Sequence, residues 1–259
     1  KIFLNKKKKF VSFVTGGDPD ITTSLQIIKS LAKNGSDIIE IGMPFSDPMA
    51  DGPTIQQSSI RAIKNKIDLE DIFKISRNFR KTNDETPLIL MGYYNIIFHY
   101  GVSKFVKKCV SNGIDGLIIV DLQPEEDTEL LKEIKSTNLD LIRLITPTTN
   151  NERFNQILKN ASGFLYYVNV TGTTGQHSAN LNDIKKSILN FKKRTKLPIV
   201  SGFGIKNVKQ VREICRFSDG VVVGSSIVNI VEKNYIDNKK NIIGLVSNFV
   251  KRLNKGTIS

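Results

Sequence analysis

The sequence predicts an α/β protein that folds as a single (β/α)8 TIM barrel. Short apolar runs alternate with amphipathic stretches along all 259 residues, a pattern typical of repeated βα units around a parallel sheet. Eight such units fit the length of a barrel of this class. Polar and glycine-rich residues follow most of the apolar runs, and no linker interrupts the chain. We therefore expect one domain over residues 1–259.

Strands are expected where short apolar runs are bounded by turn residues, and helices where apolar residues recur every three or four positions. The expected strands cover residues 11–15, 37–42, 87–91, 116–121, 139–145, 163–168, 198–201 and 220–223. The expected helices cover residues 21–34, 54–64, 69–81, 102–112, 125–137, 151–159, 181–194, 207–214 and 225–233, with a closing helix at 237–254. In a barrel, the loops that follow the strands share one face, where active sites lie.

Composition excludes several classes of protein. The chain is 39% hydrophobic and 24% charged, as ordinary globular proteins are. No apolar run approaches the roughly 18 residues of a membrane span, and the basic start has no signal-peptide core. We expect a cytoplasmic protein of bacterial type or one of an organelle stroma. Two cysteines and two widely separated histidines, His99 and His177, predict neither a disulfide framework nor a metal site.

The net charge of +13 raises the possibility of nucleic-acid binding. The distribution of the charge argues against it. Apart from residues 6–9, the lysines are spread over polar helix faces and are not interleaved with aromatic residues. We expect no nucleic-acid partner and no membrane partner.

Two carboxylates stand close together in the first half of the chain. Strand alternation places Glu40 on the face opposite to Ile39 and Ile41. Asp51 follows in a loop that prolines stiffen, within reach of the strand end. Such a pair can divide acid and base roles if its surroundings separate the two pKa values. The alternative is that Asp51 caps the helix beginning near Thr54 while Glu40 pairs with a lysine.

Glycines cluster after the last three expected strands. Residues 171–175, 202–205 and 224–226 combine glycine with small polar residues, and the last of these opens a helix. Glycine lets backbone N–H groups approach a phosphate closely, and a helix N-terminus adds free donors and a favourable dipole. Loops after strands seven and eight are a frequent phosphate site in this architecture. The pattern favours a phosphate site over simple turns.

Apolar residues near the strand ends have two interpretations. They are barrel core, or some of them line the pocket of a substrate with a flat apolar part. Tyr166 and Tyr167 should face opposite sides of the barrel wall. The other members of this group are Phe13, Met91, Ile118, Val120, Leu144 and Phe203.

Several of these segments together resemble the tryptophan synthase alpha chain family. The resemblance rests on residues 40–56 (EIGMPFSDPMADGPTIQ) and on the shorter motifs at 13–15, 17–19, 166–168, 171–172, 202–205 and 224–225, in the family's order. It implies a barrel lyase that cleaves indole-3-glycerol phosphate to indole and glyceraldehyde 3-phosphate in tryptophan biosynthesis. It also implies a beta-chain partner that carries pyridoxal phosphate and consumes the indole in an alpha2-beta2 heterotetramer, with no cofactor in the alpha chain.

The resemblance also assigns residues to roles. The catalytic residues are Glu40, expected to move protons between indole C3 and the side-chain hydroxyl, and Asp51, expected to accept the indole N–H. Thr174 belongs to the mobile loop and Tyr166 packs on the ring. The expected phosphate site is formed by Gly175, Gly204, Gly224 and Ser225, and the expected indole wall by Phe13, Met91, Ile118, Val120, Leu144 and Phe203.

The chain departs from the family pattern in three places. Gln123 stands where proline is usual, and Asn169 and Gln176 replace small residues beside the mobile loop. The segment before the first strand is also expected to be shorter than in the family. These departures concern the loop and the partner contact, not the reacting groups.

The alternative function is a phosphate-binding barrel isomerase of amino-acid biosynthesis. Such an enzyme would share the late glycine loops and would need an acid and a base after strands one and five. Those positions offer Asp18 and only Thr146 with Thr148.

Overall fold

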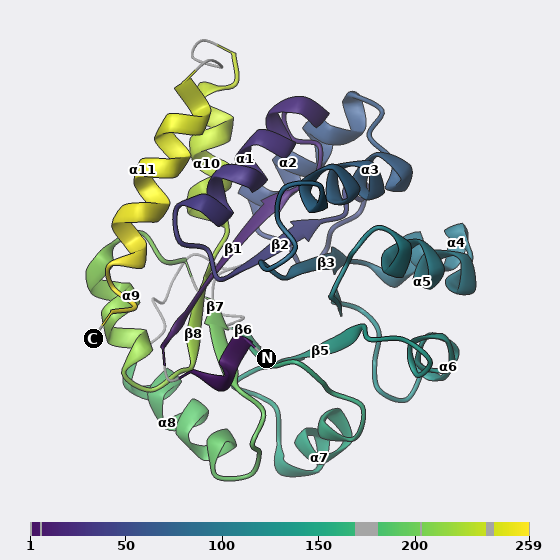
Figure 1. The fold of residues 1–259 in the computed structure, drawn as a ribbon. Helices are drawn as coiled ribbons and strands as arrows, with labels where there is room; N and C mark the ends of the chain where they lie inside the picture. The colour runs from purple at the N-terminus through teal and green to yellow at the C-terminus, as the bar shows by residue number, and fades with distance from the viewer. Residues whose placement is uncertain (1, 6, 169–180, 203, 237–240, 259) are drawn as a thin grey trace.

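The structure is a computed structural model that describes residues 2–5, 7–168, 181–202, 204–236 and 241–258. Eight parallel strands form a closed barrel in which each strand pairs with its neighbours in the chain and β1 pairs with β8 (Figure 1). The strands are β1 (Lys9–Thr15), β2 (Ile38–Gly42), β3 (Leu88–Gly92), β4 (Gly116–Ile119), β5 (Asp140–Ile145), β6 (Leu165–Val168), β7 (Ile199–Gly202) and β8 (Gly220–Val223). The predicted (β/α)8 barrel is confirmed.

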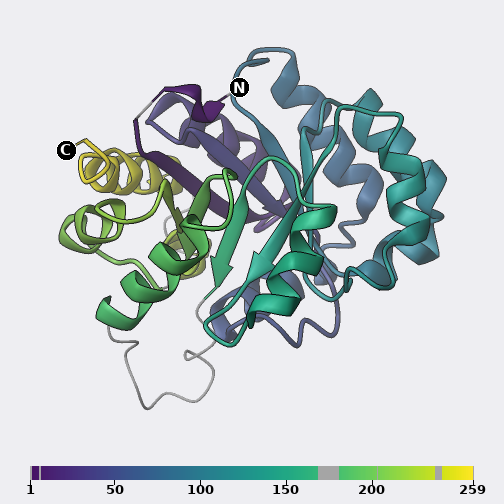
Figure 2. The same ribbon diagram turned by 90° about the horizontal axis from the view of Figure 1, so that it is seen from below.

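Helices surround the strands (Figure 2). They are α1 (Ile21–Lys33), α2 (Pro53–Lys64), α3 (Leu69–Arg80), α4 (Tyr94–Tyr100), α5 (Val102–Ser111), α6 (Thr128–Ile134), α7 (Asn151–Lys159), α8 (Leu181–Lys192), α9 (Val208–Cys215), α10 (Ser225–Asn234) and α11 (Ile242–Asn254). Side-chain caps begin four of them, because the oxygens of Asp20, Asp68, Asn150 and Asn207 accept a backbone N–H of the first turn.

Strand alternation divides the apolar residues into two cores. Ile39 and Ile41 belong to the large core between strands and helices, while Ile38 belongs to the small core inside the barrel. Glu40, between the two outward isoleucines, is fully buried on the inner side. Tyr166 faces the interior and Tyr167 faces the helix layer, as predicted.

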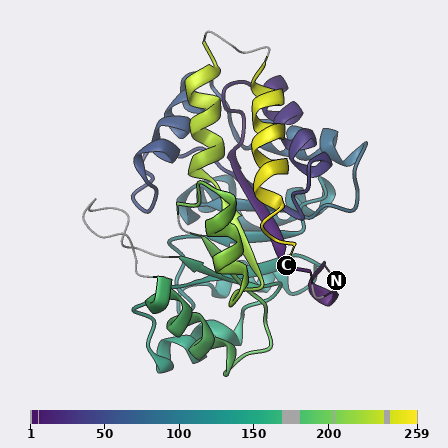
Figure 3. The same cartoon turned by 90° about the vertical axis from the view of Figure 1, so that its left-hand side faces the viewer.

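Both ends of the chain pack against the barrel. A 3-10 turn, η1 (Ile2–Leu4), precedes β1, and its Phe3 ring lies 5.7 Å from the Phe164 ring at the base of the inner core. Helix α11 packs beside α1 and α10 (Figure 3). The predicted closing helix begins at Ile242 in the described part of the chain, and residues 237–240 lie outside it.

Most predicted boundaries lie within two residues of those in the structure, and the helix expected at 125–137 differs by three residues at each end. Strand β4 ends at Ile119, two residues early, where a turn begins. The helix expected at 125–137 covers only α6, whose N-cap residue Asp127 makes no side-chain cap and pairs with Arg143 instead. Helix α4 was not predicted.

Among the described residues, no helix is long and apolar enough to cross a bilayer.

A network of ion pairs centred on Arg61 joins the loop after β1 to helices α2 and α10. Arg61 on α2 donates from Nε and Nη2 to the two carboxylate oxygens of Asp18, both at 2.9 Å, and from Nη1 to Glu232 on α10 at 3.1 Å. The side chains of Arg61 and Asp18 are 12% and 3% exposed. Removing one partner of such a pair leaves an uncompensated buried charge.

We expect the substitution Arg61→Met to lower the free energy of unfolding by about 3–5 kcal/mol, because Asp18 would lose its bidentate partner. Urea unfolding measures the change. The control is Glu70→Gln, which breaks the exposed pair of Lys108 and Glu70 and should cost less than about 1 kcal/mol. Equal costs for the two variants would show that the buried network does not stabilise the fold.

Candidate functional site

Glu40 is a buried carboxyl without a partner among the described residues. Neither of its oxygens accepts or donates a hydrogen bond among the described residues, and no described lysine pairs with it. Burial in the barrel raises the pKa of Glu40 from 4.5 to about 8. The alternative of a Glu40–lysine pair is therefore wrong for the described residues, and at neutral pH the carboxyl is mainly protonated.

Asp51 is held by a tyrosine and does not cap a helix. The N-cap of α2 is Gly52, and no side chain caps the helix. Instead, the Tyr93 hydroxyl donates to Asp51 Oδ2 at 3.1 Å and accepts the Ala50 N–H at 2.9 Å. Burial raises the pKa of Asp51, and the Tyr93 hydroxyl acts in the opposite direction. The helix-cap alternative is wrong.

Tyr93 was missed by sequence reasoning, although it directly follows β3. Its ring stacks on Phe45 with centroids 5.0 Å apart, which fixes the position of the hydroxyl. A tyrosine just after a barrel strand is a signal that could have identified it.

A cavity of about 180 Å³ is lined both by Asp51 and by Gly224 and Ser225 at the start of α10. Burial, Glu40 and Asp51 together raise the pKa of Tyr166, because both carboxyl groups lie near its ring. The cavity brings together seven of the predicted residues: Phe13, Asp51, Met91, Tyr166, Gly204, Gly224 and Ser225. It is also lined by Gly202 and Ile205 of the predicted glycine loop 202–205, and by Ile55 and Val222, which were not predicted as site residues.

The other predicted residues do not line this cavity. Ile118 is fully buried in the inner core, in the cluster that also contains Phe13 and Tyr166. Val120 and Leu144 pack against that cluster and also line a separate cavity of about 340 Å³ together with Gln123, which accepts a hydrogen bond from Arg153. Thr174, Gly175 and Phe203 lie outside the described residues, as do Asn169 and Gln176.

Two glycines make room for the aromatic residues of the cavity. A Cβ at Gly202 would lie 2.6 Å from the Tyr166 hydroxyl oxygen, and one at Gly224 would lie 3.2 Å from Phe13 Cβ. Because these contacts are too short or tight, larger residues would push the rings out of place. The glycines therefore shape the cavity as well as leaving the backbone accessible.

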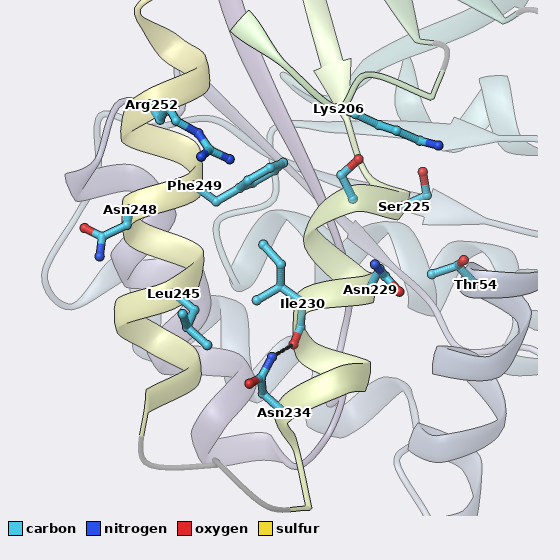
Figure 4. Close-up of a pocket in the computed structure, with 11 residues that line it drawn as sticks. Thr54, Lys206, Ser225, Asn229, Ile230, Asn234, Leu245, Asn248, Phe249 and Arg252 are labelled. Carbon is cyan, nitrogen blue, oxygen red and sulfur yellow. Dashed lines mark hydrogen bonds between the residues drawn. The ribbon is translucent and has the colours of Figure 1, made fainter.

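The end of the cavity at α10 is suited to an anion. Gly224 is the N-cap of α10 and makes no side-chain cap, so the first N–H groups of the helix are available there. The Ser226 hydroxyl donates to the Ile205 carbonyl at 2.6 Å, which ties the loop after β7 to the first turn of α10. Ser225 lies at the start of this helix (Figure 4).

The residues needed for the alternative isomerase are not arranged for acid and base chemistry. Asp18 is occupied by Arg61. The Thr146 hydroxyl lies 2.9 Å from that of Thr148, and neither group is a general base at neutral pH. The geometry favours the Glu40 and Asp51 pair.

The fold and the site together are those of a (β/α)8-barrel enzyme with a buried carboxyl group inside the barrel and an uncapped helix N-terminus at the end of its cavity. A sequence profile of the tryptophan synthase alpha chain family matches residues 2–257. The chain belongs to this family.

Solved structures agree with the family match. The alpha subunit of tryptophan synthase from Legionella pneumophila is 37% identical with a TM-score of 0.92, covering 98% of this chain and 94% of that one. A structure from Aquifex aeolicus is 40% identical with a TM-score of 0.87, covering 97% and 93%. A tryptophan synthase complex from Pyrococcus furiosus is 30% identical with a TM-score of 0.85, covering 95% and 98%.

Proposed function

We propose that this chain cleaves indole-3-glycerol phosphate by a retro-aldol reaction to indole and glyceraldehyde 3-phosphate. The observation that carries the proposal is the neutral carboxyl of Glu40 inside the barrel, which has no partner among the described residues. It lies near a cavity that has Asp51 on its wall and the uncapped N-terminus of α10 at one end. Family membership supports the same reaction. An apolar wall with two polar ends suits a substrate that carries a flat ring and a phosphate.

Glu40 can act first as an acid and then as a base. The bond to the glycerol side chain breaks only after indole C3 is protonated, because the ring carbon is otherwise a poor leaving group. Protonated Glu40 donates to C3, and the resulting carboxylate takes the proton of the side-chain hydroxyl as the bond breaks. A pKa of about 8 allows both transfers near neutral pH.

Asp51 and the helix end align the substrate. Ionised Asp51 accepts the indole N–H and stabilises the positive charge that grows on the ring during protonation. Backbone donors at Gly224 and Ser225 hold the phosphate, so binding energy from the remote end of the substrate orients the reacting carbon. We assign Thr174, Gly175 and Phe203 to the same site on the family resemblance alone.

We also propose that a tryptophan synthase beta chain is the partner of this protein, in an alpha2-beta2 assembly. The Pyrococcus furiosus relative is described as an a2b2 complex with mutual activation. In this proposal pyridoxal phosphate belongs to the beta chain, and the alpha chain works without a cofactor, in the cytoplasm or an organelle stroma.

The direct test is an assay of indole release from indole-3-glycerol phosphate, with and without a cognate beta chain. We expect release by the isolated chain and faster release in the complex, because a partner that binds the competent state more tightly also populates it. Failure to release indole under both conditions would overturn the proposed reaction. Release without binding or activation by the beta chain would overturn the proposed partner alone.

A further inference from the structure

Lys206 stands beside the phosphate end of the candidate site. It follows Ile205 in the loop after β7 and is exposed. Figure 4 shows its side chain extended past the first turn of α10, with the ammonium group on the same side as Ser225 and Thr54. Lys206 and Ser225 line one cavity of about 840 Å³, and Ser225 also lines the central cavity. Ser225 is therefore common to both spaces.

The peptide bond that precedes Lys206 is fixed at both of its polar atoms. The preceding carbonyl, that of Ile205, accepts the Ser226 hydroxyl at 2.6 Å. The Lys206 N–H donates to Gln210 Oε1 at 2.8 Å on α9. Both anchors belong to helices, so the side chain starts from a defined point next to the N-terminus of α10.

The charges around the central cavity leave a role for a cation. None of its lining residues in the described part of the chain is lysine or arginine, and Asp51 adds a carboxyl group. A phosphate ester carries close to two negative charges at neutral pH, whereas a helix N-terminus supplies roughly half a positive charge. No described acidic residue forms an ion pair with Lys206.

Arg252 is the other cation of the larger cavity, but it is engaged elsewhere. Its guanidinium carbon lies over the Phe249 ring of the same helix, α11, at 5.6 Å from the ring centroid. In Figure 4 it lies on the α11 side of the groove, apart from Ser225. Lys206 is the better placed of the two.

We propose that the Lys206 ammonium binds the phosphate of the substrate from the solvent side and supplements the backbone donors of α10. Lys206 is thus a specificity-determining residue for the dianionic end of the ligand, not a participant in proton transfer. This inference rests on the proposed function. Charge-assisted hydrogen bonds from lysine to phosphate are stronger than those of neutral donors.

The test compares Lys206→Met with Lys206→Arg and with Lys209→Met. Lys209 is an exposed lysine on α9 three positions further on, so its variant changes the net charge equally. The readouts are KM for indole-3-glycerol phosphate, the inhibition constant of inorganic phosphate, the dissociation constant of indole, and kcat.

We expect Lys206→Met to raise KM and the phosphate inhibition constant by about 10-fold, since a charge-assisted contact is worth about one to two factors of ten at most in a solvated site. Values of kcat and indole affinity should stay within about 2-fold, because the lost contact to the phosphate stabilises the bound substrate and the transition state equally. Lys206→Arg should restore most of the affinity, and Lys209→Met should have no effect. The difference between wild type and Lys206→Met should shrink at high salt.

Gly224→Val separates failure of this inference from failure of the proposed function. Its side chain would crowd Phe13 and the helix end that holds the phosphate. If Gly224→Val weakens phosphate binding but Lys206→Met does not, or if Lys209→Met has the same effect as Lys206→Met, the role of Lys206 is overturned while the phosphate site stands. If the wild-type chain neither releases indole nor binds phosphate, the proposed function itself is overturned.

Discussion

Replacing Glu40 by glutamine is expected to lower kcat for indole release by at least about 10²-fold, the lower range for loss of a general acid and base. Glutamine keeps the size of the side chain but cannot donate a proton to C3 or take one from the hydroxyl. Substrate affinity should change little, because Glu40 makes its contribution during proton transfer. Steady-state kinetics measure both quantities. Near-native turnover would remove Glu40 from the mechanism.

The same variant should gain stability relative to the wild type as the pH rises above 5. Folding raises the pKa of Glu40 from 4.5 to about 8, so between these values the folded chain keeps a proton that the unfolded chain has released. The contribution of protonated Glu40 to the free energy of unfolding of the wild type is complete below pH 4.5. It falls as the pH rises, by up to about 1.4 kcal/mol per pH unit. Glutamine cannot ionise and escapes this loss.

Urea unfolding of both proteins at several pH values tests the expectation. The stability of Glu40→Gln relative to wild type should increase from pH 5 and level off near pH 8. A pH-independent difference would mean that Glu40 is already ionised in the folded chain. Lost activity with gained stability would identify a residue retained for chemistry at a cost to the fold.

The barrel could be predicted from sequence because its strands are local and strongly apolar. Each short run carries its own turn signals, and strand alternation alone places Glu40 inside. Helix α4 could not be predicted in this way. Its seven residues are mostly aromatic or β-branched, and its first N–H, that of Tyr94, donates to Asp121 Oδ1 at 2.7 Å from the loop after β4. That capping interaction joins the segments after two neighbouring strands, β3 and β4, so no local sequence pattern predicts it.

The sequence predicted many residues of the candidate site, but it did not predict their protonation states or their contacts. The neutral state of Glu40 depends on complete burial without a partner among the described residues, an environment that the closed barrel produces. Val120 and Leu144 lie near strand ends and pack against the inner core, as predicted, and they also line a separate cavity of about 340 Å³. Tyr93 matters through a contact with Asp51 that spans 42 positions in the chain.

Replacing Asp51 by asparagine is expected to lower kcat/KM by about 10²–10³-fold, the range for loss of a charge that stabilises a transition state. Asparagine keeps the shape but cannot balance the positive charge on the protonated indole ring. Tyr93→Phe should lower kcat/KM by about 10-fold, because it removes the hydroxyl that positions Asp51 Oδ2. Kinetics with indole-3-glycerol phosphate measure both.

A double-mutant cycle shows whether Tyr93 acts through Asp51. If it does, Tyr93→Phe should cost much less in the Asp51→Asn background than in the wild type. The pH profile gives an independent readout. The Tyr93 hydroxyl lowers the pKa of Asp51, so its removal should raise that pKa and move the acidic limb of kcat/KM to higher pH. Multiplicative losses with an unmoved acidic limb would show that Tyr93 supports the fold of the loop and does not position the carboxylate.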